Sequence, residues 1–199
     1  DLHAKAFDMT YDWDLFDQLR DIAKGKADAS ALQAWWARRE ARYPGDAFRM
    51  NFTANHDSNS WHGSCKEFFG TQACFKAMAV LAATLPGVPL IYGGQETFFE
   101  KRLAFFEKDP INWRDLPLAA FYGEMLALKR RHAALANGQY GGTLAWLDTG
   151  DAGVVGFRRE RGASRVDVFV NLVAQRRELS LADGGHLSLP SWGWVVKAV

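Results

Sequence analysis

The sequence is poor in the residues that build disulfide frameworks and metal centres. It contains two cysteines and five histidines in 199 residues, and neither a CxxC nor an HExxH pattern occurs. We expect Cys65 and Cys74 to lie in one helix, roughly 13 Å apart, which is too far for a disulfide bond. The sequence therefore predicts two buried thiols, no disulfide and no metal site.

Features of proteins that bind nucleic acid or membranes are also missing. The 24 basic residues balance 23 acidic ones to a net charge of +1, and they form no basic stripe. The longest apolar stretch, residues 77–85, is too short to span a bilayer. No signal or transit peptide is visible. We expect neither nucleic acid nor a membrane as a partner, and the compartment stays open between cytoplasm and periplasm or secretion.

Apolar and aromatic residues, in contrast, are plentiful. They make up 48% and 14% of the chain, with eight tryptophans, which is enough to bury a core. Tryptophan near polar loops also suits sugars, whose C–H faces can stack on an indole ring. The chain begins at Asp1 rather than Met, so we expect a segment upstream of it.

The first two-thirds of the chain alternates short strands with longer helices. Strands are expected at residues 6–13, 48–53 and 88–92. Helices are expected from residue 15 to Gly25, from an N-cap at Ser30, and over residues 65–85 and 117–132. This order predicts a parallel sheet built from strand–helix repeats.

The pattern changes near residue 138. Helical periodicity ends there, and six short, partly alternating apolar runs follow between turns, as in half-buried antiparallel strands. We therefore expect an α/β domain over residues 1–138 and an all-β domain over residues 139–199.

Polar residues follow two of the expected parallel strands. Asn55, His56 and Asp57 follow the second strand, and Gln95 and Glu96 follow the third. In a βα barrel the carboxyl ends of the strands face the catalytic mouth. Taken alone, the Asn-His-Asp run is also typical of an ordinary polar turn.

The motifs around these residues, in their order and spacing, closely resemble the end of the catalytic barrel in the α-amylase family, glycoside hydrolase family 13. The resemblance covers nearly the whole chain. Its motifs are residues 6–13 (Ala-Phe-Asp-Met-Thr-Tyr-Asp-Trp), 52–57 (Phe-Thr-Ala-Asn-His-Asp), 59–63 (Asn-Ser-Trp-His-Gly), 86–96 (Pro-Gly-Val-Pro-Leu-Ile-Tyr-Gly-Gly-Gln-Glu), 101–102 (Lys-Arg) and 108–113 (Lys-Asp-Pro-Ile-Asn-Trp).

The resemblance implies the last strands, six to eight, of a (β/α)8 TIM barrel, followed by a small antiparallel β-sandwich domain. It also implies part of a retaining hydrolase or transglycosylase acting on starch-like α-glucans or malto-oligosaccharides. Retention needs a carboxylate nucleophile and a carboxyl acid/base, and the family adds a third carboxylate. By its place in the motif, Asp57 matches this third carboxylate, the transition-state stabiliser. His56 matches the histidine that binds a sugar hydroxyl.

Other candidate substrate-binding residues are Asn55, Trp61, Arg102 and Asp109. For Arg102 and Asp109 the alternative is a charged surface loop, and for Trp61 it is a cover over its own loop. Asp12, in the first strand motif, is interpreted as a structural or loop carboxylate. No cofactor is identified; the resemblance allows calcium in the parent protein, at sites upstream of this chain.

In the family that the chain resembles, the nucleophile and the acid/base belong to strands four and five of the barrel, which we expect to precede Asp1. Residues 156–160 (Gly-Phe-Arg-Arg-Glu) superficially resemble the nucleophile motif but lie in the β domain, where we expect an exposed strand with solvated charges. We therefore expect the chain alone to be inactive, and to pair with the missing N-terminal part of the barrel or to self-associate.

Two alternative functions stay open. One is a non-catalytic carbohydrate-binding or structural remnant of the same family. The other keeps catalysis with a different reaction, such as trehalose formation or sucrose cleavage. The sequence fixes neither the exact substrate nor the choice between hydrolysis and transglycosylation.

Overall fold

Three parallel strands form the first sheet of the protein, a computed structural model that describes residues 2–182 and 184–198. The strands are β1 (Met9–Tyr11), β2 (Phe48–Phe52) and β3 (Val88–Leu90), and they lie side by side in chain order. Met9 pairs with Phe48, and Met50 pairs with Val88. Within the described residues, β1 and β3 each pair with β2 alone, so both outer edges of the sheet are open.

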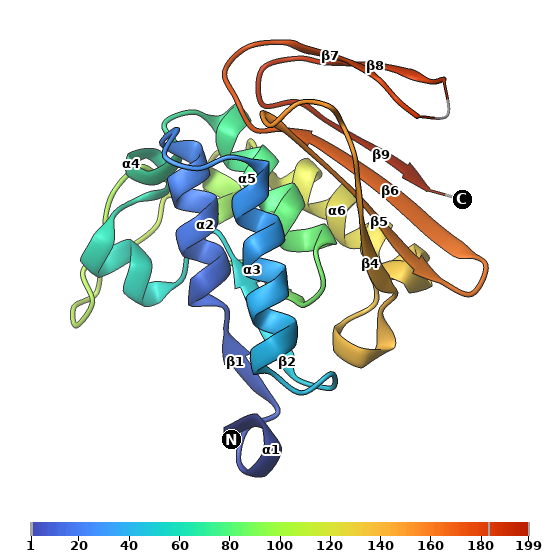
Figure 1. The fold of residues 1–199 in the computed structure, drawn as a ribbon. Coiled ribbons are helices and arrows are strands. Elements are labelled where there is room, and N and C mark those ends of the chain that lie inside the picture. The colour runs from blue at the N-terminus through green and yellow to red at the C-terminus, as the bar shows by residue number, and fades with distance from the viewer. Residues whose placement is uncertain (1, 183, 199) are drawn as a thin grey trace.

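Helices separate these strands, as the sequence predicted. After the short α1 (Leu2–Lys5), the helices α2 (Trp13–Ala23) and α3 (Ala29–Arg42) join β1 to β2. Next, α4 (Cys65–Phe69) and α5 (Gln72–Thr84) join β2 to β3, and α6 (Ala119–Arg131) follows β3. Figure 1 shows α2 and α3 running side by side. The expectation of parallel strands alternating with helices is confirmed.

Two expected helix boundaries were wrong. The second helix is capped by Asp28, whose Oδ1 accepts the Ser30 N–H at 2.9 Å, and not by Ser30. The expected helix over residues 65–85 is two helices, because Gly70 adopts a φ of +70° and Thr71 caps α5. A left-handed residue ends a helix, and glycine adopts this conformation at little cost.

Cys65 and Cys74 therefore lie in different helices, so the distance predicted from a single helix does not apply. Both thiols are nevertheless free and buried, which confirms the interpretation itself. Burial disfavours the thiolate and raises the pKa of each to about 12.

Antiparallel strands make up the remainder of the chain, again as predicted. A four-stranded sheet has the order β4 (Thr143–Leu147), β5 (Val154–Arg161), β6 (Ser164–Asn171), β9 (Trp194–Ala198). The hairpin of β7 (Arg177–Ser180) and β8 (His186–Leu189) forms a second small sheet, drawn at the top of Figure 1. Val154, Phe169, Leu179, Leu187 and Leu189 form one buried cluster that spans both sheets.

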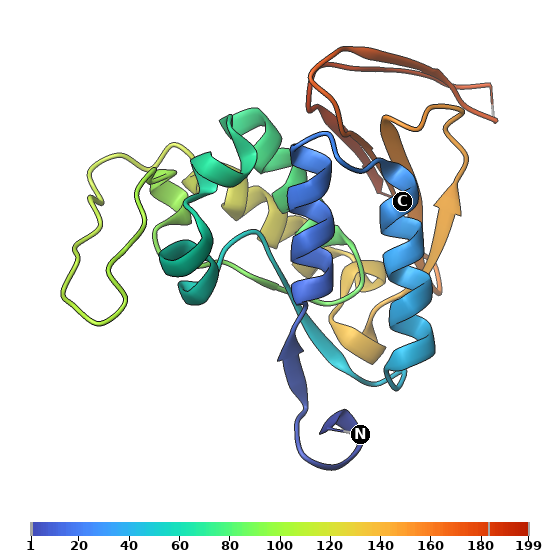
Figure 2. The same ribbon diagram turned by 60° about the vertical axis from the view of Figure 1, so that its left-hand side comes forward.

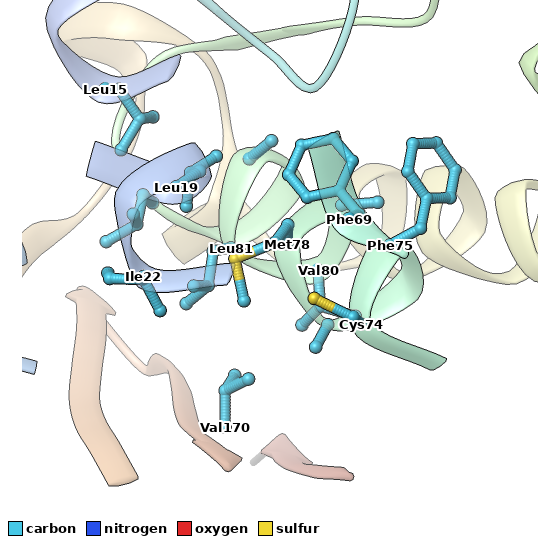
Figure 3. Close-up of a cluster of buried hydrophobic side chains, with 14 of the residues drawn as sticks. Leu15, Leu19, Ile22, Phe69, Cys74, Phe75, Met78, Val80, Leu81 and Val170 are labelled. Atoms are coloured by element: carbon cyan, nitrogen blue, oxygen red, sulfur yellow. The ribbon is translucent and has the colours of Figure 1, made fainter. Parts of the chain in front are cut away.

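Helix α5 carries the main hydrophobic core between the two parts of the chain. Ten of its thirteen residues are buried, as expected for a helix that is covered on every side. Figure 3 shows Met78 and Leu81 of α5 near Leu19 and Ile22 of α2, with Val170 of β6 below them. One continuous cluster includes side chains from all three elements.

The interpretation of residues 156–160 as an exposed strand was wrong. This segment lies in β5, where Phe157 and Arg159 are fully buried. The Arg159 Nη1 donates to the Thr84 carbonyl at 2.9 Å, and its Nη2 donates to the Gly142 carbonyl at 3.1 Å. Arg159 thus ties the end of α5 to the start of the antiparallel sheet. Burial lowers its pKa to about 10.

Lys129 of α6 provides a pH-dependent contribution to stability. Its Nζ donates to the Leu135 carbonyl at 2.6 Å, and burial lowers its pKa to about 8. In the unfolded chain the lysine pKa is about 10.4. Between these two values the unfolded state binds more protons, so this residue makes the free energy of unfolding rise with pH.

We predict that the free energy of unfolding of wild type, relative to Lys129→Met, rises by about 2 kcal/mol from pH 7 to pH 9.5. Urea unfolding at a series of pH values measures it. Comparison with Lys129→Met cancels the other groups that titrate in the same range. A difference that stays constant over this range would contradict the assignment.

Candidate active site at the carboxyl ends of the parallel strands

Polar side chains gather where the three parallel strands end. Asp12 follows β1, Asn55, His56 and Asp57 follow β2, and Gln95 follows β3. Because the strands are parallel, their carboxyl ends share one edge of the sheet. The structure thus brings the predicted strand-end residues to one side of the molecule.

Asp12 is a structural carboxylate, as interpreted from the sequence. It is buried and caps α2, with its Oδ1 accepting the Leu15 N–H at 3.0 Å. The same oxygen accepts the Trp35 Nε1–H at 3.3 Å and lies 3.5 Å from the Arg49 Nη2. Asp12 therefore joins β1 and β2 to α2 and α3.

Asn55 shapes the turn that carries the site. Its Oδ1 accepts the Ser58 N–H at 2.7 Å, and its own N–H donates to the Ser58 Oγ at 2.8 Å. Asn55 is only 1% exposed, and both of these hydrogen bonds lie within the turn itself. A contact between Asn55 and a sugar stays a prediction.

His56 and Asp57 project outward from this turn. The His56 Nε2 lies 3.5 Å from the Asp57 Oδ1, and the two side chains are 49% and 42% exposed. Asp57 precedes a short helical turn, Ser58–His62, but its carboxylate does not cap that turn. An imidazole and a carboxylate therefore stand together on the surface, able to bind neighbouring hydroxyl groups.

The loop after β3 is fixed against the loop after β2. The Gln95 Nε2 donates to the Thr53 Oγ1 at 2.8 Å in a buried contact, and the Gln95 Oε1 accepts the Tyr92 N–H. Glu96 accepts the Gly94 N–H at 3.1 Å, which is a contact within its own loop. The bond between Gln95 and Thr53 therefore holds the carboxyl ends of β2 and β3 next to each other.

A long loop, residues 98–118, joins β3 to α6 and extends away from the helices in Figure 2, in yellow-green. Its start is anchored by Asn59, which is fully buried. The Asn59 Oδ1 accepts the Leu103 N–H at 2.8 Å, and its Nδ2 donates to the Lys101 carbonyl at 3.3 Å. The sequence places Asn59 in one of the motifs that resemble the family, but it does not predict that Asn59 anchors this loop.

The two charged residues predicted to contact sugar in this loop are engaged with other side chains. Arg102 donates twice to Glu67, at 2.7 Å and 3.0 Å, and these bonds hold the pKa of Glu67 at about 2. Asp109 pairs with Lys101, which lowers its pKa, and accepts the Ala104 N–H at 3.0 Å. Both residues position the loop, and their contact with a sugar stays a prediction.

Trp61 lies in a group of exposed aromatic rings that includes two residues not singled out from the sequence. Its ring centroid is 5.3 Å from that of Phe105 and 6.3 Å from that of Phe106. The available signal was the adjacent Phe-Phe pair in a segment without helical or strand periodicity.

In the residues that the structure describes, no group of three or more His, Cys, Asp or Glu side chains could hold a metal ion. Over residues 2–182 and 184–198, no helix is long and apolar enough to cross a bilayer.

Comparison with known proteins finds two relatives of this chain in sequence. The chain is 30% identical to the α-amylase MalA of Haloarcula japonica over 138 residues, which are 68% of this chain and 19% of that protein. It is 26% identical to neopullulanase 2 of Thermoactinomyces vulgaris over 169 residues, covering 82% and 28% of the two chains. No family model matches.

Solved structures share the fold over nearly the whole chain. A cyclomaltodextrinase superposes with a TM-score of 0.80 and 22% identity, over 99% of this chain and 37% of that one. An α-amylase from Lactobacillus plantarum gives 0.78 and 22%, over 98% and 49%. A cyclic α-maltosyl-(1→6)-maltose hydrolase from Arthrobacter globiformis, solved with that saccharide, gives 0.79 and 20%, over 100% and 46%.

Sequence and fold together place the chain in the α-amylase family, glycoside hydrolase family 13. The chain spans less than a third of the length of these two curated relatives, and less than half of these three structures.

Proposed function

We propose that this chain is the C-terminal part of a retaining α-glucosidic hydrolase or transglycosylase that acts on starch-like or malto-oligosaccharide substrates. In this proposal β1, β2 and β3 are strands six to eight of a (β/α)8 barrel, and the antiparallel strands form its C-terminal domain. The observation that carries it is the exposed pair of His56 and Asp57 at the carboxyl edge of the parallel sheet.

This pair supplies part of the chemistry of retention. The Asp57 carboxylate accepts hydrogen bonds from hydroxyls of the sugar being cleaved, and these bonds strengthen as positive charge develops on the ring. His56 holds a neighbouring hydroxyl. A nucleophile and an acid/base about 5 Å apart complete the reaction, and both come from outside this chain.

The open edges of the parallel sheet support a partner that supplies further strands. Both β1 and β3 leave backbone N–H and C=O groups without a strand partner among the described residues, and such edges pair readily with another strand. A barrel closes only when every edge is paired. The preceding part of a longer protein fills this role best, and a second copy of the chain is the alternative.

Titration of the chain with maltoheptaose, followed by NMR, tests the proposal. We expect Asp57→Asn to weaken binding about tenfold, because a charge-assisted hydrogen bond is replaced by a weaker one. Asp46→Asn is the matched control, since Asp46 is exposed and precedes β2 at the opposite end of the strand. Absence of maltoheptaose binding, or equal binding by the two variants, would refute the proposed site.

The exposed His56–Asp57 pair is equally compatible with a second function, saccharide binding without catalysis. It predicts the same binding result but no activity when the missing strands are supplied. An activity assay of the completed assembly therefore distinguishes the two functions, whereas a binding measurement does not.

A further inference from the structure

A cavity lies on the face of the antiparallel sheet that points away from α5. Strand β6 separates the two faces, because successive side chains of a strand point to opposite sides. On one side, fully buried valines join the core that includes α5: Val166, Val168 and Val170. On the other side, Arg165, Asp167 and Phe169 line a cavity of about 290 Å³. The sheet itself therefore separates the cavity from α5.

Apolar side chains form part of the lining. Phe169 is only 4% exposed, and it packs with Leu179 and Leu187 of the β7–β8 hairpin. Leu147 and Leu181 pack against the same cluster and also line the cavity. Figure 1 shows the hairpin next to β6 and β9. An aromatic ring with leucines beside it offers surface on which a ligand can bury an apolar group.

Charged side chains form a row across three strands on this face. Arg158 of β5 lies opposite Asp167 of β6, which in turn lies opposite Lys197 of β9. Directly opposite residues of an antiparallel ladder share one face, and all three of these residues line the cavity. Arg158 donates to both carboxylate oxygens of Asp167, at 2.7 Å and 2.8 Å. These two bonds orient the guanidinium and compensate the charge of the carboxylate.

Two further cations at the cavity have no such partner. Over residues 2–182 and 184–198, the side chains of Arg165 and Lys197 form no hydrogen bond and no ion pair. Both residues are exposed. The hydrogen bonds from Arg158 lower the pKa of Asp167 most, and the charges of Arg165 and Lys197 lower it further. Both cations therefore lie near a carboxylate that is already paired.

The other carboxylates in this region leave an excess of positive charge at the cavity. Asp148 lines the cavity, and its Oδ1 accepts the Gly150 N–H at 2.9 Å within its own turn. Glu160 lies opposite Arg165 in the ladder but does not line the cavity. With its internal ion pair counted as neutral, the lining retains two cations against Asp148 alone, a net charge of +1.

We propose that this cavity binds a phosphate monoester, with the phosphate between Arg165 and Lys197 and the apolar part of the ligand against Phe169. Diagonal neighbours of an antiparallel ladder are roughly 7–8 Å apart, a separation that these two long side chains can bridge around one phosphate. The guanidinium supplies paired N–H donors, and the ammonium supplies a compact charge.

Charge and size both favour this class of ligand. A phosphate monoester carries about −1.5 to −2 near neutral pH, which matches two unpaired cations better than the single charge of a carboxylate does. The volume of about 290 Å³ is at the lower end of the range for small-molecule sites. The expected ligand is therefore a phosphate carried on a body of single-ring size.

Titration of the chain with phenyl phosphate at constant ionic strength, followed by NMR, tests this site. We expect Arg165→Gln and Lys197→Gln each to weaken binding about tenfold, because each removes one charged donor from the phosphate. Arg161→Gln is the matched control, since Arg161 is exposed in the same sheet but does not line the cavity. It should stay within about twofold of wild type, because its charge is screened. Thermal unfolding verifies that each variant is folded.

Two simpler probes separate the parts of the site. Inorganic phosphate lacks the ring and should bind about tenfold more weakly than phenyl phosphate, and phenol, which lacks the charge, should bind more weakly still. The proposal is overturned if phenyl phosphate does not bind at millimolar concentration, or if it binds equally to Arg165→Gln and Arg161→Gln. Equal affinity for phenyl phosphate and either simpler probe would also overturn it. These outcomes are independent of the saccharide site, since the lining residues all lie between residues 147 and 197.

Discussion

The purified 199-residue chain is expected to release no sugar from starch or maltoheptaose above the rate of an enzyme-free control. Glycosidic cleavage with retention requires two carboxyl groups about 5 Å apart in addition to Asp57. Enzymes accelerate reactions by roughly 10⁶-fold or more, so the loss of both reacting groups removes essentially all of the activity. A reducing-sugar assay over many hours, with native mass spectrometry of the same sample, makes the measurement.

Activity should return when a second polypeptide supplies the preceding strands with the nucleophile and the acid/base. Asp57→Asn should then lower kcat by about 10² to 10³-fold, which is the range for removal of one group that stabilises transition-state charge. Asp46→Asn should leave kcat unchanged. Robust hydrolysis by the chain alone would contradict the proposed division of the active site. Binding without activity in the completed assembly would favour the non-catalytic alternative.

Arg159→Ala is expected to lower the free energy of unfolding by about 3 kcal/mol or more. The substitution removes the donors to the carbonyl of Thr84, which is buried, and to the carbonyl of Gly142, which is partly buried. It also opens a cavity, because Arg159 is among the largest fully buried side chains. Urea unfolding of wild type and variant gives the difference directly.

Arg161→Ala is the matched control, since Arg161 is exposed in the same strand. Its effect should stay within about 0.5 kcal/mol. If Arg159→Ala and Arg161→Ala cost the same, the contact between α5 and the antiparallel sheet is not a major source of stability. Arg159→Met should cost less than the alanine variant, because it retains most of the side-chain volume.

Periodicity in the sequence predicted the order of the parallel strands and of most of the helices. The apolar face of α2, the parallel strands and the change to antiparallel strands after residue 138 were all recognisable before the structure. The break between α4 and α5 was not, because Gly70 within an apolar pattern does not reveal that its φ is positive. Tertiary context decides such a position.

Arg159 illustrates what local sequence cannot show. Its neighbours Arg158 and Glu160 suggested a solvated strand, and Arg158 is indeed only partly buried, paired with Asp167. The guanidinium of Arg159 is buried because α5, 75 residues earlier in the chain, ends opposite it. A contact this distant in the sequence leaves no local pattern.

The sequence predicted the positions of the candidate site residues better than it predicted their side-chain contacts. The strand-end positions of Asn55, His56 and Asp57 followed from the strand pattern, and the resemblance implied their roles. The structure places the three residues at one edge of the sheet. The engagement of Arg102 with Glu67 and of Asp109 with Lys101 was not foreseen, because loop contacts depend on how residues 98–118 fold back. Phe105 and Phe106 were missed for the same reason.

A crystal structure of the chain with maltoheptaose would test the central claim most directly. The account predicts a sugar ring hydrogen-bonded to His56 and Asp57 at the carboxyl ends of the parallel strands. A saccharide bound instead on the antiparallel sheet, away from the carboxyl ends of β1, β2 and β3, would contradict it.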